Sequence, residues 1–323
     1  MGMDISQLRT IIHVSELGSL SKAADRLRIA QPALSRQVRM LEDELGIRLF
    51  DRHGRGMVVT EAGQEVLRHA YRIMGELEEI RTSVADEDAP LRGHVSIGMP
   101  PTVSDILSVP LVSAFRARHP DATIRIVSAY TGYLLDWLHR GDIDVAILFE
   151  SRPLRSLRSQ SLLEEILYLI GPAGSALHPD RPVAFDSMAD RKLLLPSTGH
   201  GLRNILEDCA RERGIRLDVQ VEADSYSTLK NLVKSGHGLT ILPLAPIHEE
   251  IASGLLTYAP LIDPVPLRRL MLTYPSDRAA PRLARFAAAT ITATAADLVG
   301  SGIWSGRLLL QDEVVTPSDK FSA

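Results

Sequence analysis

One predicted helix near the N-terminus carries the side chains best suited to reading DNA base edges. Residues 31–42 place an apolar face on one side of a helix and a polar set on the other, namely Gln31, Ser35, Arg36 and Arg39. In a major groove, glutamine can pair with adenine and arginine with guanine, whereas serine can contact bases or phosphates. Any one of these residues alone is more typical of a solvated helix face. The whole set favours a recognition helix.

Two later loops combine hydroxyl side chains with predicted helix starts, an arrangement suited to binding a small anion. In each loop a strand ends and a helix begins, so that free N–H groups meet the positive end of the helix dipole. The first loop carries Thr102 and Ser104, and the second carries Ser197, His200 and the possible charge partner Arg203. Tyr130 and Thr131 follow a third predicted strand, and ligands of α/β sheets bind beyond such strand ends. The alternative is that these hydroxyl groups only cap helices.

Catalytic and cofactor motifs are missing from the sequence. The ten histidines show no paired metal-ligand spacing, and the chain lacks HExxH, G-x-S-x-G and GxxxxGK[ST]. The glycine-rich stretch from Gly236 to Pro243 lacks the spacing of a dinucleotide fingerprint, and a helix end turning into a strand explains it. We therefore expect no catalysis, metal or cofactor, although an enzyme with an α/β cleft is a minor alternative.

Composition and charge limit the remaining possibilities. The 323 residues, with a formal net charge of −4, are ordinary for a globular protein, so any DNA contact must come from a local basic surface. No apolar stretch is long enough to span a membrane, and the first residues do not resemble a signal peptide, so we expect a cytoplasmic location. The single cysteine, Cys209, cannot form an internal disulfide and is expected to be a buried structural thiol.

The elements that must position these residues are visible in the hydrophobic pattern. Residues 6–59 contain three short helical patterns and then two β-like runs around a loop at 53–56, which is the outline of a three-helix unit with a wing. Residues 61–86 lack proline and carry an apolar stripe with steps of three and four: Val66, Ala70, Ile73, Leu77, Ile80 and Val84. We expect this helix to pair with a second copy; the alternative is a stripe packed on its own domain.

Beyond a predicted hinge at residues 85–93, short apolar runs alternate with helical patterns. Such alternation predicts α/β architecture with parallel strands, and about 200 residues of this kind favour two linked subdomains. The last residues carry little periodic apolar content and are expected to form a loose tail.

The N-terminal segment resembles the winged helix-turn-helix of LysR-type transcriptional regulators. Residues 4–64 match almost without gaps, and the matching motifs include AA at 23–24, QPALSRQ at 31–37, LF.R at 49–52 and TEAG at 60–63. The later α/β pattern fits the family's effector domain, so the resemblance covers most of the chain. The loop Gly98 to Thr102 and the helix Leu111 to Pro120 are similar to the branch that includes the nitrogen assimilation control protein.

The resemblance implies an α/β protein with an N-terminal all-α winged helix-turn-helix, a long linker helix and a two-lobed periplasmic-binding-protein-like effector domain. The corresponding boundaries are 1–60, 61–88, 89–303 and a C-terminal tail at 304–323, with lobe I at about 93–163 and 266–303 and lobe II at about 164–265. The family's DNA contacts fall on Gln31, Pro32, Ser35, Arg36, Arg52 and Arg55. Ala30 departs from the family, because many relatives place a capping serine or threonine there.

The implied function is sequence-specific control of promoters in response to a small effector. We expect a carboxylate or another anion between the lobes, self-association to a dimer or tetramer, and contact with RNA polymerase. A regulator without a dedicated inducer, controlled by its own abundance, is the main alternative. An architectural DNA-binding protein is a minor one, since such proteins seldom need a sensing domain of this size.

Overall fold

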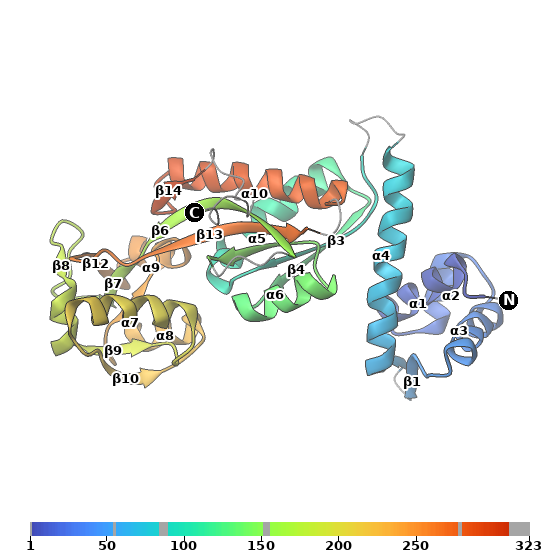
Figure 1. Ribbon diagram of the computed structural model, residues 1–323, viewed down its shortest axis with the longest axis horizontal. Coiled ribbons are helices and arrows are strands. Elements are labelled where there is room, and N and C mark those ends of the chain that lie inside the picture. Colours follow the sequence, from blue (N-terminus) through green and yellow to red (C-terminus); the bar gives the residue numbers. More distant parts are fainter. Residues whose placement is uncertain (1, 54–55, 84–89, 151–155, 277–279, 310–323) are drawn as a thin grey trace, which may run out of the picture. The chain divides into compact units, whose positions relative to one another are not determined.

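The computed structural model describes residues 2–53, 56–83, 90–150, 156–276 and 280–309. The chain forms two compact units (Figure 1). One comprises Met1–Val95, Arg118–Thr123 and Pro281–Leu283, and the other comprises Ser96–Ala117, Ile124–Ala280 and Ala284–Ala323. Within the described parts of the chain, no helix has both the length and the apolar character needed to cross a membrane.

The first unit begins with three helices and a two-stranded wing: α1 (Ile5–Leu17), α2 (Leu20–Leu27), α3 (Gln31–Leu45), β1 (Phe50–His53) and β2 (Gly56–Val59). Asp4 starts α1 with a capping box, because its carboxylate accepts from the Gln7 amide and the Gln7 side chain accepts from the Asp4 amide. The Ser19 side chain caps α2. One core joins these elements: Leu8, Ile11, Val14, Ala23, Ala24, Leu34, Val38, Leu41, Leu49 and Phe50. The predicted winged helix-turn-helix is confirmed.

The long helix α4 (Glu61–Ser83) follows the wing directly. The Thr60 hydroxyl accepts from the Gly63 amide at 2.9 Å and so caps the first turn. Gly63 lies so close to the wing that an added Cβ would be 2.1 Å from the Leu49 carbonyl oxygen. This close approach requires glycine and fixes where α4 begins relative to the wing.

The predicted apolar stripe of α4 is divided between two environments, which corrects our expectation for its first half. Ala70 is fully buried and Val66 partly buried, because both pack against the core of their own winged unit. Ile73 and Ile80, by contrast, are 39% and 65% exposed, and Leu77 is half-buried. Val84 lies outside the described residues. The start of α4 therefore belongs to the winged unit, and only the second half of the stripe can meet a partner.

The first lobe of the α/β region is built on a mixed sheet. Its elements are β3 (Gly93–Met99), α5 (Pro101–Arg118), β4 (Ala122–Ser128), α6 (Thr131–Arg140), β5 (Val145–Phe149), β6 (Leu157–Ile166), β13 (Leu267–Pro275), α10 (Arg282–Gly300) and β14 (Gly306–Leu308). Within the described residues the strand order is β14-β6-β13-β5-β3-β4. In Figure 1, α10 runs along one side of this sheet and α6 lies on the other.

Two features of this sheet differ from the sequence prediction. Strand β3 pairs with β5 in parallel, but β13 is antiparallel to both β5 and β6, because the chain returns to this lobe after building the second one. The segment predicted to be a C-terminal tail, 304–323, also begins with residues that pack into the first lobe. Trp304 is 1% exposed, and β14 pairs with β6.

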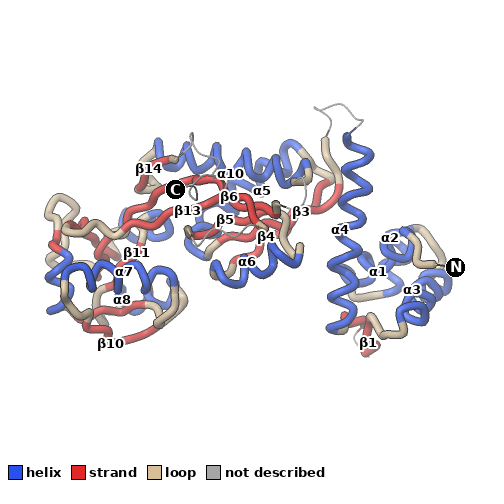
Figure 2. Tube along the Cα trace, viewed as in Figure 1, coloured by secondary structure: helices blue, strands red, loops and turns tan. Residues whose placement is uncertain are grey.

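The second lobe lies between β6 and β13 in the sequence. It contains β7 (Tyr168–Pro172), β8 (Val183–Ala184), β9 (Lys192–Leu195), α7 (Gly201–Arg213), β10 (Asp218–Glu222), α8 (Tyr226–Lys234), β11 (Thr240–Leu242), α9 (His248–Ala252) and β12 (Leu256–Ile262). The order β11-β7-β12-β8 forms one sheet, and β9 and β10 form a parallel pair. Figure 2 shows strands passing between the lobes, where β6 continues into β7 and β12 into β13. The two-lobed α/β fold is confirmed.

Candidate functional site

The exposed face of α3 presents the predicted DNA-reading residues together. Gln31, Pro32, Arg36 and Arg39 are exposed and Ser35 is half-buried, while the apolar face of the helix lies in the core. The Gln37 side chain holds α3 against α1, since it accepts from the Thr10 hydroxyl at 2.5 Å and donates to Ser6 Oγ at 3.0 Å. The helix therefore offers its polar side chains on a fixed support.

The start of α3 lacks a side-chain cap, as the sequence predicted. Ala30 makes no side-chain cap hydrogen bond, and its carbonyl oxygen accepts from the Ala33 and Leu34 amides. Arg28, in the turn before it, adopts a φ of +55° and ends α2. An uncapped helix start of this kind is a natural position for a phosphate oxygen.

The wing carries the remaining predicted contacts. Arg52 lies in β1 opposite Met57 of β2. Its side chain and the whole of Arg55 lie outside the described residues.

At the start of α5, Thr102 contacts a buried arginine that sequence analysis missed. Its Oγ1 accepts from Arg268 Nη2 at 3.1 Å, and Thr102 is only 9% exposed. Ser104 points along the helix, with its Oγ 3.2 Å from Ser108 Oγ, and Thr131 Oγ1 accepts from the Phe149 amide at 3.4 Å. Of these three predicted hydroxyl residues, Thr102 is the one tied to a charge.

At the start of α7 and in the loop before it, Ser197 and Arg203 are already paired with groups of the protein. The Ser197 amide and hydroxyl both donate to Asp224 Oδ1, at 2.9 and 2.7 Å. Arg203 is 7% exposed; it donates to Glu207 at 2.7 Å, to the Pro196 carbonyl at 3.1 Å and to Glu222 at 3.2 Å. Its charge therefore stabilises the second lobe itself.

Tyr130 connects the two lobes at this place. Its hydroxyl donates to the Asp224 carbonyl, and its ring meets the His200 ring edge-on, with centroids 4.9 Å apart. His200 Nδ1 accepts from the Leu202 amide at 3.1 Å and so caps α7. We call the group Thr102, Tyr130, His200, Asp224 and Arg268 the interlobe cluster.

The charges of the interlobe cluster influence one another. Burial lowers the pKa of His200; the Asp224 carboxylate opposes this shift and the Arg268 guanidinium adds to it. Hydrogen bonds from Ser197 lower the pKa of Asp224. Burial and the Asp224 charge raise the pKa of Tyr130. Neutral His200 and ionised Asp224 are thus the favoured states near neutral pH.

Behind Thr102 lies a buried ion pair between the two long strands. Arg268 Nε donates to Glu165, and the two side chains are 4% and 2% exposed. Trp304 Nε1 donates to the other carboxylate oxygen, Glu165 Oε1, at 2.7 Å. Both strands carry adjacent charged residues, Glu164 and Glu165 on β6 and Arg268 and Arg269 on β13, and the sequence alone did not indicate which of them are buried.

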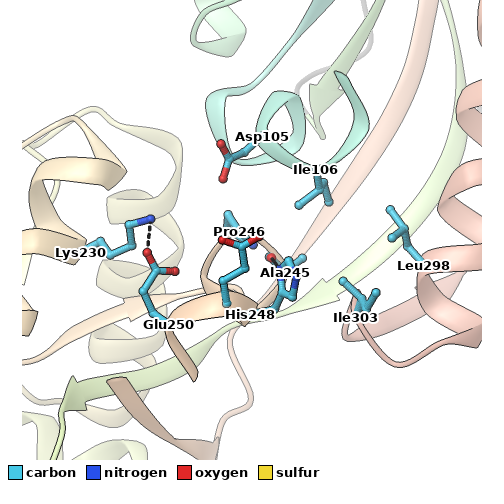
Figure 3. Close-up of a pocket in the computed structure, with 10 residues that line it drawn as sticks. Asp105, Ile106, Lys230, Ala245, Pro246, His248, Glu250, Leu298 and Ile303 are labelled. Atoms are coloured by element: carbon cyan, nitrogen blue, oxygen red, sulfur yellow. Dashed lines mark hydrogen bonds and ion pairs between the residues drawn. The ribbon is translucent and has the colours of Figure 1, made fainter. Parts of the chain in front are cut away.

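A separate cavity of about 290 Å³ lies elsewhere in the α/β region (Figure 3). Its lining includes Asp105, Lys230 and Glu250, and Lys230 Nζ is 2.6 Å from Glu250 Oε1. None of the predicted effector contacts lines it. Among the described residues, no group of three or more histidine, cysteine, aspartate or glutamate side chains is arranged to hold a metal ion.

A winged helix-turn-helix joined to a two-lobed α/β region defines a DNA-binding regulator. Residues 5–64 match the family described as bacterial regulatory helix-turn-helix protein, lysR family, and residues 88–295 match the LysR substrate binding domain. The chain belongs to the LysR family of transcriptional regulators.

Individual relatives have similar lengths to this chain. The nitrogen assimilation regulatory protein nac of Klebsiella aerogenes is 34% identical over 242 residues, covering 75% of this chain and 78% of the relative. The hydrogen peroxide-inducible genes activator of Pectobacterium carotovorum is 30% identical over 278 residues, covering 84% of this chain and 90% of the relative. The structure of a Corynebacterium glutamicum OxyR C206 mutant aligns with a TM-score of 0.67 at 27% identity, covering 94% and 96%.

Proposed function

We propose that this LysR-type DNA-binding regulator controls promoters in response to a small anion bound at the interlobe cluster. The observation that carries the effector part is the buried Arg268 guanidinium beside Thr102 at the start of α5. Since operator DNA lies in the cytoplasm, this is also the proposed location. The matched families and relatives are transcriptional regulators, and we propose no catalytic activity.

Sequence preference in DNA is proposed to come from α3. Arg36→Ala should weaken binding to sites selected by the wild-type chain from random duplexes by about 1–3 kcal/mol, if Arg36 pairs with a guanine. Binding to random DNA should change little. The matched control is Arg116→Ala, an exposed arginine on α5. Equal losses on selected and random DNA would leave Arg36 as a phosphate contact only.

The wing is proposed to position the protein on the phosphate backbone. Replacing Arg52 or Arg55 by alanine should lower affinity for all sequences and reduce the salt dependence of binding, without changing the preferred sequence. A change in preferred sequence would instead give the wing a role in base reading.

The effector is tested by measuring operator binding in the presence of cellular carboxylates and other small anions. At least one should change affinity or the length of DNA protected, and Thr102→Ala should reduce that response. If no anion has an effect and promoter output follows only the amount of protein, control by abundance becomes the better account.

Self-association is proposed to involve the exposed second half of the α4 stripe. Replacing Leu77 and Ile80 by glutamate should lower the oligomeric mass measured by light scattering, and with it operator affinity, because two reading heads would no longer be held together. Arg72→Ala, exposed on the same helix, is the control. An unchanged mass after the double substitution would contradict the proposal. Contact with RNA polymerase at the promoter is proposed as the later step.

Peroxide sensing, which the names of several relatives suggest, is not favoured in this chain. The sequence has one cysteine, so an internal disulfide cannot form. Burial and the nearby Glu212 and Asp208 charges raise the pKa of Cys209, which disfavours the reactive thiolate.

A further inference from the structure

A buried histidine holds the segment that connects α4 with β3. His119 is 5% exposed, and its Nδ1 accepts a hydrogen bond from the Leu91 amide at 3.0 Å. The Leu91 side chain is buried as well, at 6% exposed. A backbone amide and an apolar side chain of the predicted hinge are therefore both fixed shortly before β3 begins.

A surface ion pair lies next to this buried contact. Arg92 Nη2 is 3.1 Å from Asp121 Oδ2, and both side chains are largely exposed, so the pair adds little to stability. The segment that receives the hinge, Arg118–Thr123, belongs to the same compact unit as Leu91. We call Leu91, Arg92, His119 and Asp121 the hinge anchor. Its buried part depends on one acceptor atom, His119 Nδ1.

The buried hydrogen bond requires a neutral imidazole ring. An Nδ1 atom that accepts carries no proton, so the proton of the neutral ring lies on Nε2. Protonation would make Nδ1 a second donor, which cannot bind the Leu91 N–H. Burial lowers the pKa of His119, and Arg118 at the end of α5 and Arg282 at the start of α10 lower it further. The neutral ring is therefore the form that fits the anchor.

The stability that the hinge anchor contributes depends on pH in one direction. The pKa of His119 is lower in the folded chain than the usual histidine value near about 6.5, so the contribution is complete above that value. It is lost as pH falls through the lowered pKa. Since the hinge is the covalent connection between the DNA-reading elements and both lobes, the same titration changes how firmly α4 is held.

We infer that His119 is a positioning residue, which locks the hinge in its neutral form and releases it, with weaker operator binding, when it takes up a proton. A released hinge lets the DNA-reading elements adopt more orientations, and ordering them on a fixed operator costs conformational entropy. The proton is thus a second input to the regulator. This input does not depend on the proposed anion response.

The lock is tested first without DNA, by hydrogen–deuterium exchange of the full chain, followed by mass spectrometry on peptides that contain Leu91. His119→Leu keeps an apolar side chain but removes the acceptor, so exchange at Leu91 should be about fivefold faster at about pH 7.5, the factor for one hydrogen bond of about 1 kcal/mol. His119→Asn keeps an acceptor, because its Oδ1 is as many bonds from Cβ as Nδ1 is, and should exchange like the wild-type chain.

The same measurement at about pH 5.5, corrected for the intrinsic exchange rate, separates the wild-type chain from His119→Asn even where His119→Leu does not fold. The wild-type chain should lose protection at Leu91, and His119→Asn should retain it. Equal protection of these two chains at both pH values would overturn the lock.

The effect on DNA is measured by anisotropy of a labelled duplex selected by the wild-type chain, between about pH 7.5 and about pH 5.5. Wild-type affinity should fall several-fold relative to that of His119→Asn. His139→Asn is the matched control, because His139 is exposed at the end of α6, and its pH profile should follow that of the wild-type chain.

Parallel pH profiles for the wild-type chain and His119→Asn would overturn the role of the proton, and so would a profile of His139→Asn that resembled that of His119→Asn. If no duplex is selected, the proposed control of promoters fails together with the effect of the proton on operator binding. The exchange measurement then still decides whether His119 locks the hinge.

Discussion

The starts of α5 and α7 look equivalent in the sequence but differ in what already occupies them. Each follows a strand and offers hydroxyl and amide donors. At α7, Asp224 accepts both donors of Ser197, and two glutamates neutralise Arg203. At α5, Thr102 Oγ1 accepts a hydrogen bond from the buried Arg268 guanidinium. A local pattern of donors therefore predicts a place that favours negative charge, but not whether the protein supplies that charge itself.

The largest expected change in stability, and the one that best separates the two helix starts, comes from removing the Arg203 side chain. If the start of α7 is structural, Arg203→Met should lower the free energy of unfolding by about 2 kcal/mol, because it leaves a buried carbonyl and two carboxylates without their partner. Urea unfolding measures this loss. Arg211→Met, which breaks an exposed pair with Asp208 on the same helix, should cost at most about 0.5 kcal/mol. A mild effect of Arg203→Met on stability with a strong one on anion binding would reverse the roles of the two helix starts.

Tyr130 precedes α6 in the first lobe and donates to Asp224 in the second, so removing its hydroxyl should lower the free energy of unfolding by an intermediate amount. Tyr130→Phe keeps the ring against His200 but loses the hydrogen bond to the Asp224 carbonyl, at a cost of about 1 kcal/mol. Thermal or urea unfolding detects the change. The control is Tyr133→Phe, since Tyr133 is 60% exposed on α6, the helix that follows Tyr130. Equal stability of both variants would mean that the hydroxyl contributes nothing to holding the lobes.

Low pH should weaken the hydrogen bonds between Asp224 and Ser197, in the loop before α7. Because hydrogen bonds lower the pKa of Asp224, its stabilising contribution is present above the usual aspartate range, near about 3.9, and is lost as pH falls through the lowered value. Asp224→Asn should therefore flatten the pH dependence of the thermal midpoint between pH 5 and 3, by a small amount because the carboxylate is largely solvated. Asp190→Asn, at another exposed carboxylate, is the comparison. If the thermal midpoint of Asp224→Asn depended more steeply on pH than that of the wild-type chain, ionised Asp224 would not be stabilising.

The smallest effect is expected at Cys209, the half-buried thiol of α7. Cys209→Ala should change the free energy of unfolding by only about 0.5 kcal/mol, since it removes a small and partly exposed group. Treatment of the wild-type chain with hydrogen peroxide should leave operator binding unchanged, as measured by anisotropy of a labelled duplex. A peroxide response abolished in Cys209→Ala would give α7 a sensing role.

Local patterns predicted the parts of the fold that depend on neighbours in the sequence. The exposed polar face of α3, its uncapped start and the two-lobed α/β region followed from periodicity and from the LysR motifs. The interlobe cluster was only half predicted, because Arg268 meets Thr102 across 166 residues and Asp224 meets Ser197 across 27. Those pairings depend on how strands return to a sheet, which composition and periodicity do not specify. The same limit explains Ala70, whose burial depends on the packing of α4 against α1 and the core of the first three helices.

The short strand β14 has a consequence for association between molecules. It lies at the edge of the six-stranded sheet and covers the outer side of β6, where the Leu309 amide also donates to the Leu162 carbonyl at 3.0 Å. A chain shortened to residue 303 would uncover the backbone donors and acceptors of residues 162–165 in the ten-residue strand β6, and such an open edge is a template for pairing between sheets. The short strand β14 thus protects one stretch of β6 from pairing with another molecule.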